Sequence, residues 1–208
     1  MEYNGLKINW LGHSGFKIEG KRIIYIDPFK IQENEKADII LITHSHYDHC
    51  SLEDIEKIVK KDTIVFGPVD IQSKLGKISS EVKFQMLHPG QGVSVKGIII
   101  SAFPAYNLNK TFHPKSNNWL GFLIEINGVR LFHAGDTDAV DELKSLKNID
   151  ILMFPIDGAY TMDAKEAAQL CNEIMPKIAI PMHFGSIAGN KDEAIRFKSL
   201  SKCDVRIL

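Results

Sequence analysis

The chain has 208 residues, of which 44% are hydrophobic and 25% charged, and its formal net charge is -1. These values are typical of a globular chain with an extensive core, and the length predicts a single domain. Because no basic excess could neutralise phosphates, nucleic acid is not an expected partner. No apolar run reaches the roughly 18 residues that span a bilayer, and Met1 to Gly5 lack the features of a signal peptide. We therefore expect a cytoplasmic protein that does not enter membranes.

The three cysteines, Cys50, Cys171 and Cys203, are odd in number and scattered along the chain. This usage favours reduced thiols in a reducing compartment over a disulfide framework. Cys50 directly follows a histidine-rich segment, but a small buried hydrophobic residue at the start of a helix is its expected role.

Two hairpin patterns of similar layout occur far apart in the sequence. The first covers residues 10–27 and turns at Gly20, and the second covers residues 119–136 and turns at Asn127-Gly128. The Asn-Gly pair is a strong signal for a short hairpin loop. The sequence therefore predicts an antiparallel strand pair in each half of the chain.

A buried strand and a helix are expected after the first hairpin. Residues 38–43 form an apolar, β-branched run of strand length, and residues 51–60 have apolar positions at helical spacing. Ser51 followed by Asp54 is the pattern of a helix start. The segment between them, T-H-S-H-Y-D-H-C, consequently lies in a loop at the carboxyl end of a strand, where α/β proteins commonly carry their chemistry.

This loop contains three histidines and an aspartate within six consecutive positions: His44, His46, Asp48 and His49. A catalytic zinc needs neutral imidazole nitrogens and carboxylate oxygens that converge on one point. Any one of these histidines alone is better explained as a capping or core residue. Burial of three imidazoles and a carboxylate together without a cation would be costly, so the cluster predicts a metal site.

Two later strand ends carry further ligand types. Residues 132–138 end a strand in a loop that contains Asp136, and residues 178–185 end another strand at His183. Taken alone, Asp136 or Asp138 could cap a helix, and His183 could be a half-buried histidine. The recurrence of ligand types at strand ends makes one shared site the simpler interpretation.

The remaining segments complete an α/β pattern of one domain. Two β-rich halves, each with following helices, predict two sheets packed face to face with helices outside. The expected segments are a strand at 150–154, a helix at 163–174 with Thr161 as N-cap, a helix at 192–200 with Ala194, Ile195, Phe197 and Leu200 inward, and a strand at 204–208. The single domain, 1–208, then consists of halves at about 1–105 and 119–208 joined by a lid-like loop at 106–118.

The segment at 44–49 resembles the signature of the metallo-β-lactamase superfamily, in which His, His, Asp and His stand at relative positions one, three, five and six. The loops with Asp136 and His183 match in order, so the resemblance spans nearly the whole chain. It implies a four-layer αβ/βα sandwich of two mixed β-sheets, with helices on the outer faces and a metal pair at one edge. Further motifs resemble small metal-dependent hydrolases related to ascorbate-phosphate lactonases: Gly12-His13-Ser14-Gly15-Phe16, Asp27-Pro28-Phe29 and Pro155-Ile156-Asp157-Gly158.

The resemblance also implies a set of metal ligands. It places His44 and His46 on one metal, Asp48, His49 and His183 on the other, and Asp136 as the bridge between them. The implied cofactor is zinc, as one or two ions per chain, with manganese or iron as alternatives.

One ligand of the family has no direct counterpart. Relatives in this branch supply a third histidine to the first metal after a P-A-aromatic sequence, but here Pro104-Ala105-Tyr106 is followed by Asn107. An asparagine oxygen is a weaker zinc ligand than imidazole. Asn107, a water molecule or His113 could complete this metal, and a single-metal enzyme is a further alternative.

The chemistry implied by the resemblance is hydrolysis. A divalent pair lowers the pKa of a bridging water to about neutrality and polarises the group attacked, which makes a metal-bound hydroxide available. Asp48 would hold this nucleophile and accept its proton. His13 would orient the substrate or donate to the leaving group, unless it is a structural histidine bonded to a loop carbonyl. His133 would support a ligand from outside the metal site.

The substrate is less well defined, because this fold opens lactones, lactams and thioesters and also cleaves phosphodiesters. We expect a small-molecule substrate, an anionic ester that is either a lactone or a phosphodiester. Its charge could be neutralised by Lys110, Lys115, Asn117 or Arg130.

The sequence also bears on two other functional classes. The departure at Asn107 permits a metal-binding scaffold or regulatory protein with weak or no catalysis. An oxygen-reducing di-iron role is disfavoured, because the branch with that activity has a glutamate where His46 stands and needs an additional flavin domain. The sequence is also compatible with a homo-oligomer.

Overall fold

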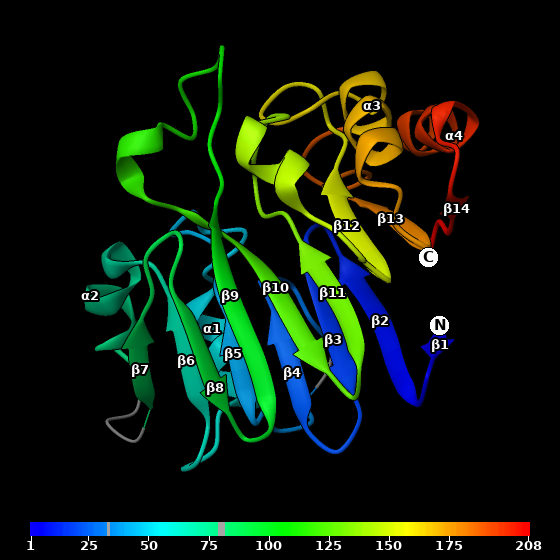
Figure 1. Cartoon of the computed structure of the whole chain (residues 1–208). Coiled ribbons are helices and arrows are strands. Elements are labelled where there is room, and N and C mark those ends of the chain that lie inside the picture. Colours follow the sequence, from blue (N-terminus) through cyan, green and yellow to red (C-terminus); the bar gives the residue numbers. More distant parts are fainter. Residues whose placement is uncertain (33, 79–81) are drawn as a thin grey trace. The chain divides into compact units, whose positions relative to one another are not determined.

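The computed structural model describes residues 1–32, 34–78 and 82–208. The chain forms two compact units, Met1–His88 (unit 1) and Pro89–Leu208 (unit 2). Each unit is built on one mixed sheet of seven strands (Figure 1). The predicted α/β class with two mixed β-sheets is therefore confirmed. Among the described residues, none of the helices has the length and hydrophobicity needed to cross a membrane.

The strands of unit 1 follow one another across the sheet in sequence order, from β1 to β7. Neighbouring strands from β1 to β4 are antiparallel, and those from β4 to β7 are parallel. The elements are β1 (Glu2–Tyr3), β2 (Leu6–Gly12), β3 (Gly15–Glu19), β4 (Ile23–Ile26), β5 (Ile39–Leu41), α1 (Leu52–Ile58), β6 (Ile64–Gly67), η1 (Val69–Ile71), α2 (Gln72–Leu75) and β7 (Lys83–Met86).

Unit 2 repeats this arrangement with β8 to β14. Neighbouring strands from β8 to β11 are antiparallel, and those from β11 to β14 are parallel. The elements are β8 (Gly92–Val95), β9 (Ile98–Pro104), η2 (Lys115–Asn117), β10 (Leu120–Ile126), β11 (Val129–His133), η3 (Asp141–Ser145), β12 (Ile151–Pro155), α3 (Ala164–Ile174), β13 (Ile178–Met182), α4 (Lys191–Leu200) and β14 (Asp204–Val205).

Strand direction determines which loops share an edge of each sheet. β2 and β4 are both antiparallel to β3, and β5 is parallel to β4, so these three strands end at the same edge of the first sheet. By the same reasoning, β9, β11, β12 and β13 end at one edge of the second sheet. Open α/β sheets commonly carry their binding residues at such carboxyl ends.

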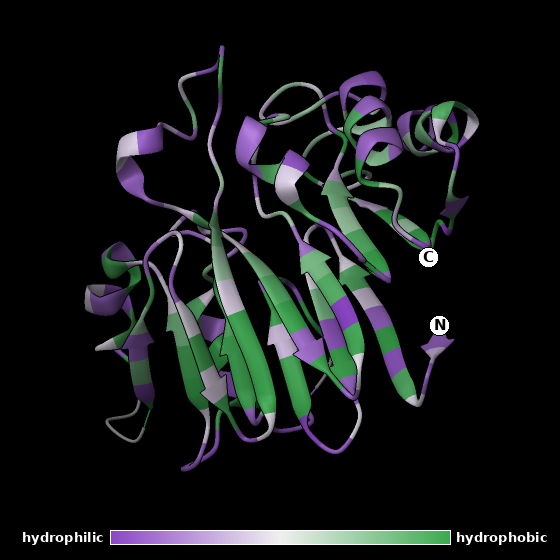
Figure 2. Ribbon diagram, viewed as in Figure 1, coloured by the Kyte–Doolittle hydropathy of each residue, from purple (hydrophilic) through white to green (hydrophobic). Residues whose placement is uncertain are grey.

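The central strands of each sheet are hydrophobic along most of their length, as Figure 2 shows. β5, β12 and β13 are buried at every position, which is typical of central parallel strands. In unit 1, α1 packs Ile55 and Ile58 into a buried cluster with Tyr25 and Ile40. Full burial of a side chain of this size contributes about 1.5–3 kcal/mol relative to exposure, so these contacts hold the strands that end at the predicted metal site.

The two predicted hairpins are confirmed. β10 and β11 pair around Asn127 and Gly128, which have φ angles of 53° and 74°. Two consecutive positive φ angles define the type I′ turn that Asn-Gly favours. In unit 1, β3 and β4 pair antiparallel around Gly20.

The boundary between the units falls after His88, whereas the sequence placed it near residue 105. β8 and β9 pair with each other and β9 pairs with β10, so residues 92–104 belong to the second sheet. The loop at 106–118 consequently lies inside unit 2, between β9 and β10, and does not join the two halves. The pairing partner of a strand is set by tertiary contacts, and the local pattern could not supply it.

The start of α3 also differs from the prediction, because Thr161 is not its N-cap. Asp163 caps this helix and accepts hydrogen bonds from the N–H groups of Lys165 and Glu166, while the Glu166 carboxylate accepts from Asp163 N. This reciprocal arrangement is a capping box. The Thr161 hydroxyl instead donates to the Asp157 carboxylate.

The last helix and strand are placed as predicted, with local differences. Ala194 and Phe197 of α4 are buried, but Ile195 and Leu200 are exposed. Ile195 follows Ala194 directly and therefore points about 100° away from the face that 194 and 197 share. β14 covers only Asp204–Val205 of the predicted 204–208.

Asp54 in the first turn of α1 fixes the loop that follows β4. Its buried carboxylate accepts from the backbone N–H groups of Lys30 and Ile31 at 2.8 and 3.2 Å, and from Ser51 and Lys57. Burial alone would raise the pKa of Asp54, but the bonds from Ser51, Lys57 and Lys30 hold that pKa below its usual value.

We expect Asp54→Asn to lower the free energy of unfolding by about 1–3 kcal/mol, because the amide N–H₂ would face a buried backbone donor. The lowered pKa stabilises the fold above the unfolded pKa of about 3.9, and this contribution is lost as the pH falls through the folded value. The difference between wild type and variant in urea titrations should therefore shrink in acid. Glu53→Gln, on the exposed side of the same turn, should change stability by less than about 0.5 kcal/mol; an equal loss in both variants would contradict this role.

Candidate metal centre

The loop after β5 carries the first ligand set: His44, His46, Asp48 and His49. The loop turns sharply, because the N–H groups of His49 and Cys50 both donate to the carbonyl oxygen of His46, at 3.1 and 2.8 Å. Nε2 of His44 and Nδ1 of His46 lie 3.0 Å apart. At this distance one nitrogen accepts the proton of the other, or both face the same cation.

His13 joins the first ligand set from the turn between β2 and β3. Its Nε2 lies 3.0 Å from Oδ2 of Asp48, and Nε2 of His49 lies 3.9 Å from the same oxygen. The rings of His44 and His49 lie close together, with centroids 4.0 Å apart and planes tilted by 42°. Unit 1 therefore gathers His13 and all four members of the first ligand set at one edge of its sheet.

Asp27, directly after β4, holds the imidazole of His49 directly and that of His44 through Thr43. Its fully buried carboxylate accepts from Thr43 N at 2.8 Å and from the Thr43 hydroxyl at 2.6 Å, and it lies 2.8 Å from Nδ1 of His49. Since the Thr43 hydroxyl donates to Asp27, it must accept from Nδ1 of His44, 2.9 Å away. Both rings thus carry their proton on Nδ1, which leaves the lone pairs of Nε2 for a metal.

Unit 2 holds the second ligand set: His113, Asp136 and His183. Nε2 of His113 and Nε2 of His183 approach the same oxygen, Oδ2 of Asp136, at 3.3 and 3.1 Å. The three side chains come from the loops after β9, β11 and β13, and all are at most 3% exposed. The structure therefore brings together Asp136 and His183 as predicted, and it adds His113 to them.

Each imidazole of the second ligand set is held through its outer nitrogen. Nδ1 of His113 lies 3.0 Å from Oδ1 of Asn107, and Nδ1 of His183 lies 3.0 Å from Oδ2 of Asp157. If both Nδ1 atoms donate outward, two Nε2 lone pairs face a carboxylate oxygen. Such an arrangement is repulsive unless a proton or a cation stands among them, so these residues fit a divalent cation.

Asp157 is suited to hold His183 because it stays ionised. Burial alone would raise the pKa of its carboxyl, but His183, the Thr161 hydroxyl and the N–H of Tyr160 together hold that pKa below its usual value. Tyr160 N donates to Oδ1 of Asp157 at 2.6 Å. A carboxylate on the outer nitrogen fixes the tautomer of a ligating histidine and raises its basicity.

Asn107 supports His113 through its side-chain oxygen. Its Oδ1 accepts from both N and Nδ1 of His113, and its Nδ2 donates to Asp138 at 3.1 Å and to the carbonyl oxygen of Tyr160 at 2.9 Å. Both amide protons and both lone pairs of the oxygen are therefore used. Of the alternatives that the sequence left open for the third histidine, this geometry favours His113.

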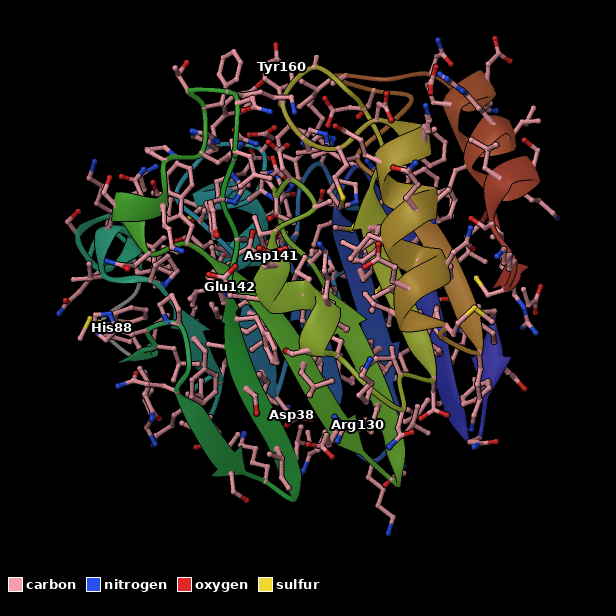
Figure 3. The ribbon with its side chains drawn as sticks, turned by 45° about the horizontal axis from the view of Figure 1, so that its top comes forward. Asp38, His88, Arg130, Asp141, Glu142 and Tyr160 are labelled. Carbon is pink, nitrogen blue, oxygen red and sulfur yellow. The ribbon has the colours of Figure 1, made fainter. Side chains whose placement is uncertain are left out.

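The cations expected to meet an anionic substrate are paired with carboxylates. Lys110 lies 2.8 Å from Asp138 and Lys115 lies 3.0 Å from Glu142. Arg130 stands at the amino end of β11, about 10 Å along the strand from His133, and at the opposite end of unit 2 from Tyr160 (Figure 3). Arg130 is therefore placed away from the second ligand set.

Two further sequence predictions concern residues beside the ligands. His133, the last residue of β11, is buried and its Nδ1 accepts from Gly135 N at 3.2 Å, so it shapes the loop that leads to Asp136. Cys50 is buried in the apolar cluster of unit 1, as expected. Burial raises the pKa of its thiol to about 12, which makes it a poor source of thiolate for a metal.

Asp27 and Asp157 contact His49 and His183, but the sequence analysis assigns neither of them a role. Both stood in the motifs that suggested the family, and both follow a buried strand directly or within two residues. An acidic residue at the carboxyl end of a buried strand is the signal that could have identified them, since the ligand-bearing loops leave the same edge. Which histidine each one holds is decided only by the fold.

Comparison with known proteins identifies relatives over nearly the whole chain. Residues 7–183 match the family model described as the β-lactamase superfamily domain. A metal-dependent hydrolase of Thermoplasma acidophilum is 34% identical over 209 aligned residues, which cover 94% of this chain and 91% of the relative. A related protein of Pyrococcus abyssi is 37% identical and covers 92% of this chain and 89% of its own.

Solved structures show the same fold. A crystal structure from Parabacteroides distasonis, titled as a metal-dependent hydrolase, superposes with a TM-score of 0.87 at 32% identity and covers 97% of this chain and 92% of that one. The metallo hydrolase Igni18 of Ignicoccus hospitalis has a TM-score of 0.79 at 24% identity, with 98% and 94% of the chains covered; at this identity the likeness concerns the fold alone.

We expect Asp27→Asn to weaken metal binding by about 10–100-fold, because the amide has one acceptor oxygen fewer and cannot accept all three hydrogen bonds that the Asp27 carboxylate receives from Thr43 N, the Thr43 hydroxyl and His49. Competition with a chromophoric chelator measures this change. The matched control is Asp38→Asn at the amino end of β5, where the carboxylate accepts from Ile23 N at 3.0 Å. The control should lower stability without changing metal affinity. Equal affinities for wild type and Asp27→Asn would show that Asp27 has no part in the site.

Proposed function

The chain belongs to the β-lactamase superfamily, among its metal-dependent hydrolases, and from that premise we propose that its two ligand sets jointly hold one or two divalent cations. The observation that carries the proposal is the convergence of His113 Nε2 and His183 Nε2 on one oxygen of Asp136. The first ligand set supplies further nitrogens and a carboxylate, and the outer nitrogens of His44 and His49 are already held. Imidazole and carboxylate donors of this kind suit zinc, with iron or manganese as alternatives.

In this proposal His44, His46 and His113 would hold one cation, and Asp48, His49 and His183 would hold the other. Asp136 would be available to both cations, since a carboxylate has two oxygens and four lone-pair sites. His113 thus takes the place of the family histidine that is missing at Asn107. The alternative of a non-catalytic scaffold rests on this missing ligand. The position of His113 therefore favours an enzyme.

When bound, the cations would lower the pKa of a water molecule to about neutrality and polarise the bond under attack. Asp48 would then accept the proton of the attacking water, and His13, 3.0 Å from Asp48 Oδ2, would hold that carboxylate in place and receive the proton in turn. Thr43 and Asp27 keep the imidazoles in the tautomer that leaves Nε2 available. The reaction that these residues support is hydrolysis without a serine or cysteine nucleophile.

We keep a small anionic ester, a lactone or a phosphodiester, as the proposed substrate. The lysines of the 106–118 loop are engaged by Asp138 and Glu142, so the negative charge of the substrate would be neutralised chiefly by the cations. An exposed aromatic pair, Phe112 and Tyr160, with ring centroids 4.8 Å apart, lies beside the second ligand set and offers a surface for the apolar part of the substrate.

We expect purified protein to contain zinc, iron or manganese and to hydrolyse a member of a panel of lactones and phosphodiesters. Elemental analysis gives the metal content, and a chelator should abolish turnover that added metal restores. His46→Ala should lose metal and at least about 100-fold in kcat/KM. Protein that neither holds nor takes up these metals would refute the proposal, whereas metal-loaded protein without turnover on any ester would support the scaffold.

The assignment of His113 has its own test. We expect His113→Ala to lower the affinity for one cation and kcat/KM by about 100-fold or more, and Asn107→Ala to lower affinity by about 10–100-fold, because it removes only the support of His113. His88→Ala, in the loop after β7, is the matched control and should leave both quantities unchanged. A larger loss in Asn107→Ala than in His113→Ala would make Asn107 the ligand.

A further inference from the structure

Cys171 and Cys203 are neighbours in unit 2 although they stand 32 positions apart in the sequence. Cys171 lies in α3, and Cys203 lies in the short segment between α4 and β14. Their Sγ atoms are 3.2 Å apart. Since a disulfide bond is about 2.05 Å long, a shift of roughly 1 Å would bring the sulfurs to bonding distance. The geometry points to a disulfide between Cys171 and Cys203 that fastens the last segment of the chain to α3.

The segment that carries Cys203 is already held in the required position. Asn172, the residue after Cys171, donates through Nδ2 to the carbonyl oxygen of Leu200 at 3.0 Å and accepts through Oδ1 from Lys202 N at 2.7 Å. On the other side of Cys203, β14 pairs with β13. Little conformational freedom therefore remains to be lost when the bond forms.

The two thiols differ in a way that suits stepwise oxidation. Cys171 is fully buried, whereas Cys203 is partly exposed. The hydrogen bond with the Cys171 thiol lowers the pKa of Cys203, and the same contact together with burial raises the pKa of Cys171. Cys203 is therefore the sulfur that meets an oxidant as a thiolate.

The oxidant is a low-molecular-weight disulfide, RSSR. The Cys203 thiolate attacks one sulfur of RSSR, the S–S bond breaks and RS⁻ leaves; Cys171 then attacks the Cys203 sulfur of the mixed disulfide and expels the second RS⁻. The two thiol protons end on the two RS⁻ groups. The two cysteines are oxidised by two electrons, RSSR is reduced to two RSH, and the atoms balance.

The bond closes the chain around β13, because α3 precedes this strand and α4 and β14 follow it. The carboxyl end of β13 carries His183. A cross-link over a loop of this length stabilises chiefly by restricting the unfolded chain. It does not require secretion, since intracellular proteins of hyperthermophiles also keep disulfides.

The test uses the full-length protein incubated with oxidised or reduced glutathione. Oxidation should lower the count of titratable thiols in denaturant from three to one, lower the intact mass by two hydrogens and yield a peptide that links Cys171 to Cys203. We expect Tm to rise by roughly 5–15 °C, and a reductant should reverse the rise. A stable glutathione adduct on Cys203, or three thiols after oxidation, would overturn the proposal.

Variants separate the bond from unspecific effects. Cys50→Ser should keep the full response to oxidation, while Cys203→Ser should lose it and retain the Tm of the reduced wild type. Cys171→Ala serves if Cys203→Ser is unstable, and it should give a lasting glutathione adduct on Cys203. A redox-dependent Tm that persists in Cys203→Ser would contradict a stabilising disulfide between Cys171 and Cys203. A cross-link without any rise in Tm would contradict it as well.

Discussion

The histidines of the proposed metal site depend on an acceptor beside one nitrogen of each ring. A neutral imidazole carries its proton on one ring nitrogen and a lone pair on the other. A fixed hydrogen-bond acceptor beside one nitrogen places the proton there and leaves the lone pair on the other nitrogen. Thr43 holds His44, Asp27 holds His49 and Asn107 holds His113 in this way, and the Asp157 carboxylate lies 3.0 Å from Nδ1 of His183. Without these acceptors each ring could rotate or change tautomer, and the donors would no longer converge.

The sheets explain why the acceptors are where they are needed. In each unit a group of antiparallel strands is followed by parallel strands in sequence order. Every second antiparallel strand and all of the parallel strands therefore have their carboxyl ends at the same edge of the sheet. A ligand and its support then come from different strands that end side by side, as His49 after β5 and Asp27 after β4 do. Buried strands fix these loop ends more firmly than the loops could fix themselves.

The exchange at Asn107 shows how such a site accommodates a changed residue. The amide cannot match imidazole as a zinc ligand, but it can accept two hydrogen bonds and donate two, and it does so to His113, Asp138 and Tyr160. The side chain at this position thus orients His113, which we propose as the ligand.

The sequence by itself determined the α/β class, both hairpins, α1 with its Ser51 cap and the ligand types at 44–49, 136 and 183, because hydrophobic period, turn residues and ligand spacing are local properties. Tertiary structure alone decided that residues 92–104 join the second sheet, that Asp163 caps α3, that His113 and not Asn107 approaches Asp136, and that Cys171 meets Cys203. The physical reason is that strand pairing and the direction of an imidazole nitrogen depend on partners distant in the chain. Local pattern supplies the donors, and the fold decides which of them face one another.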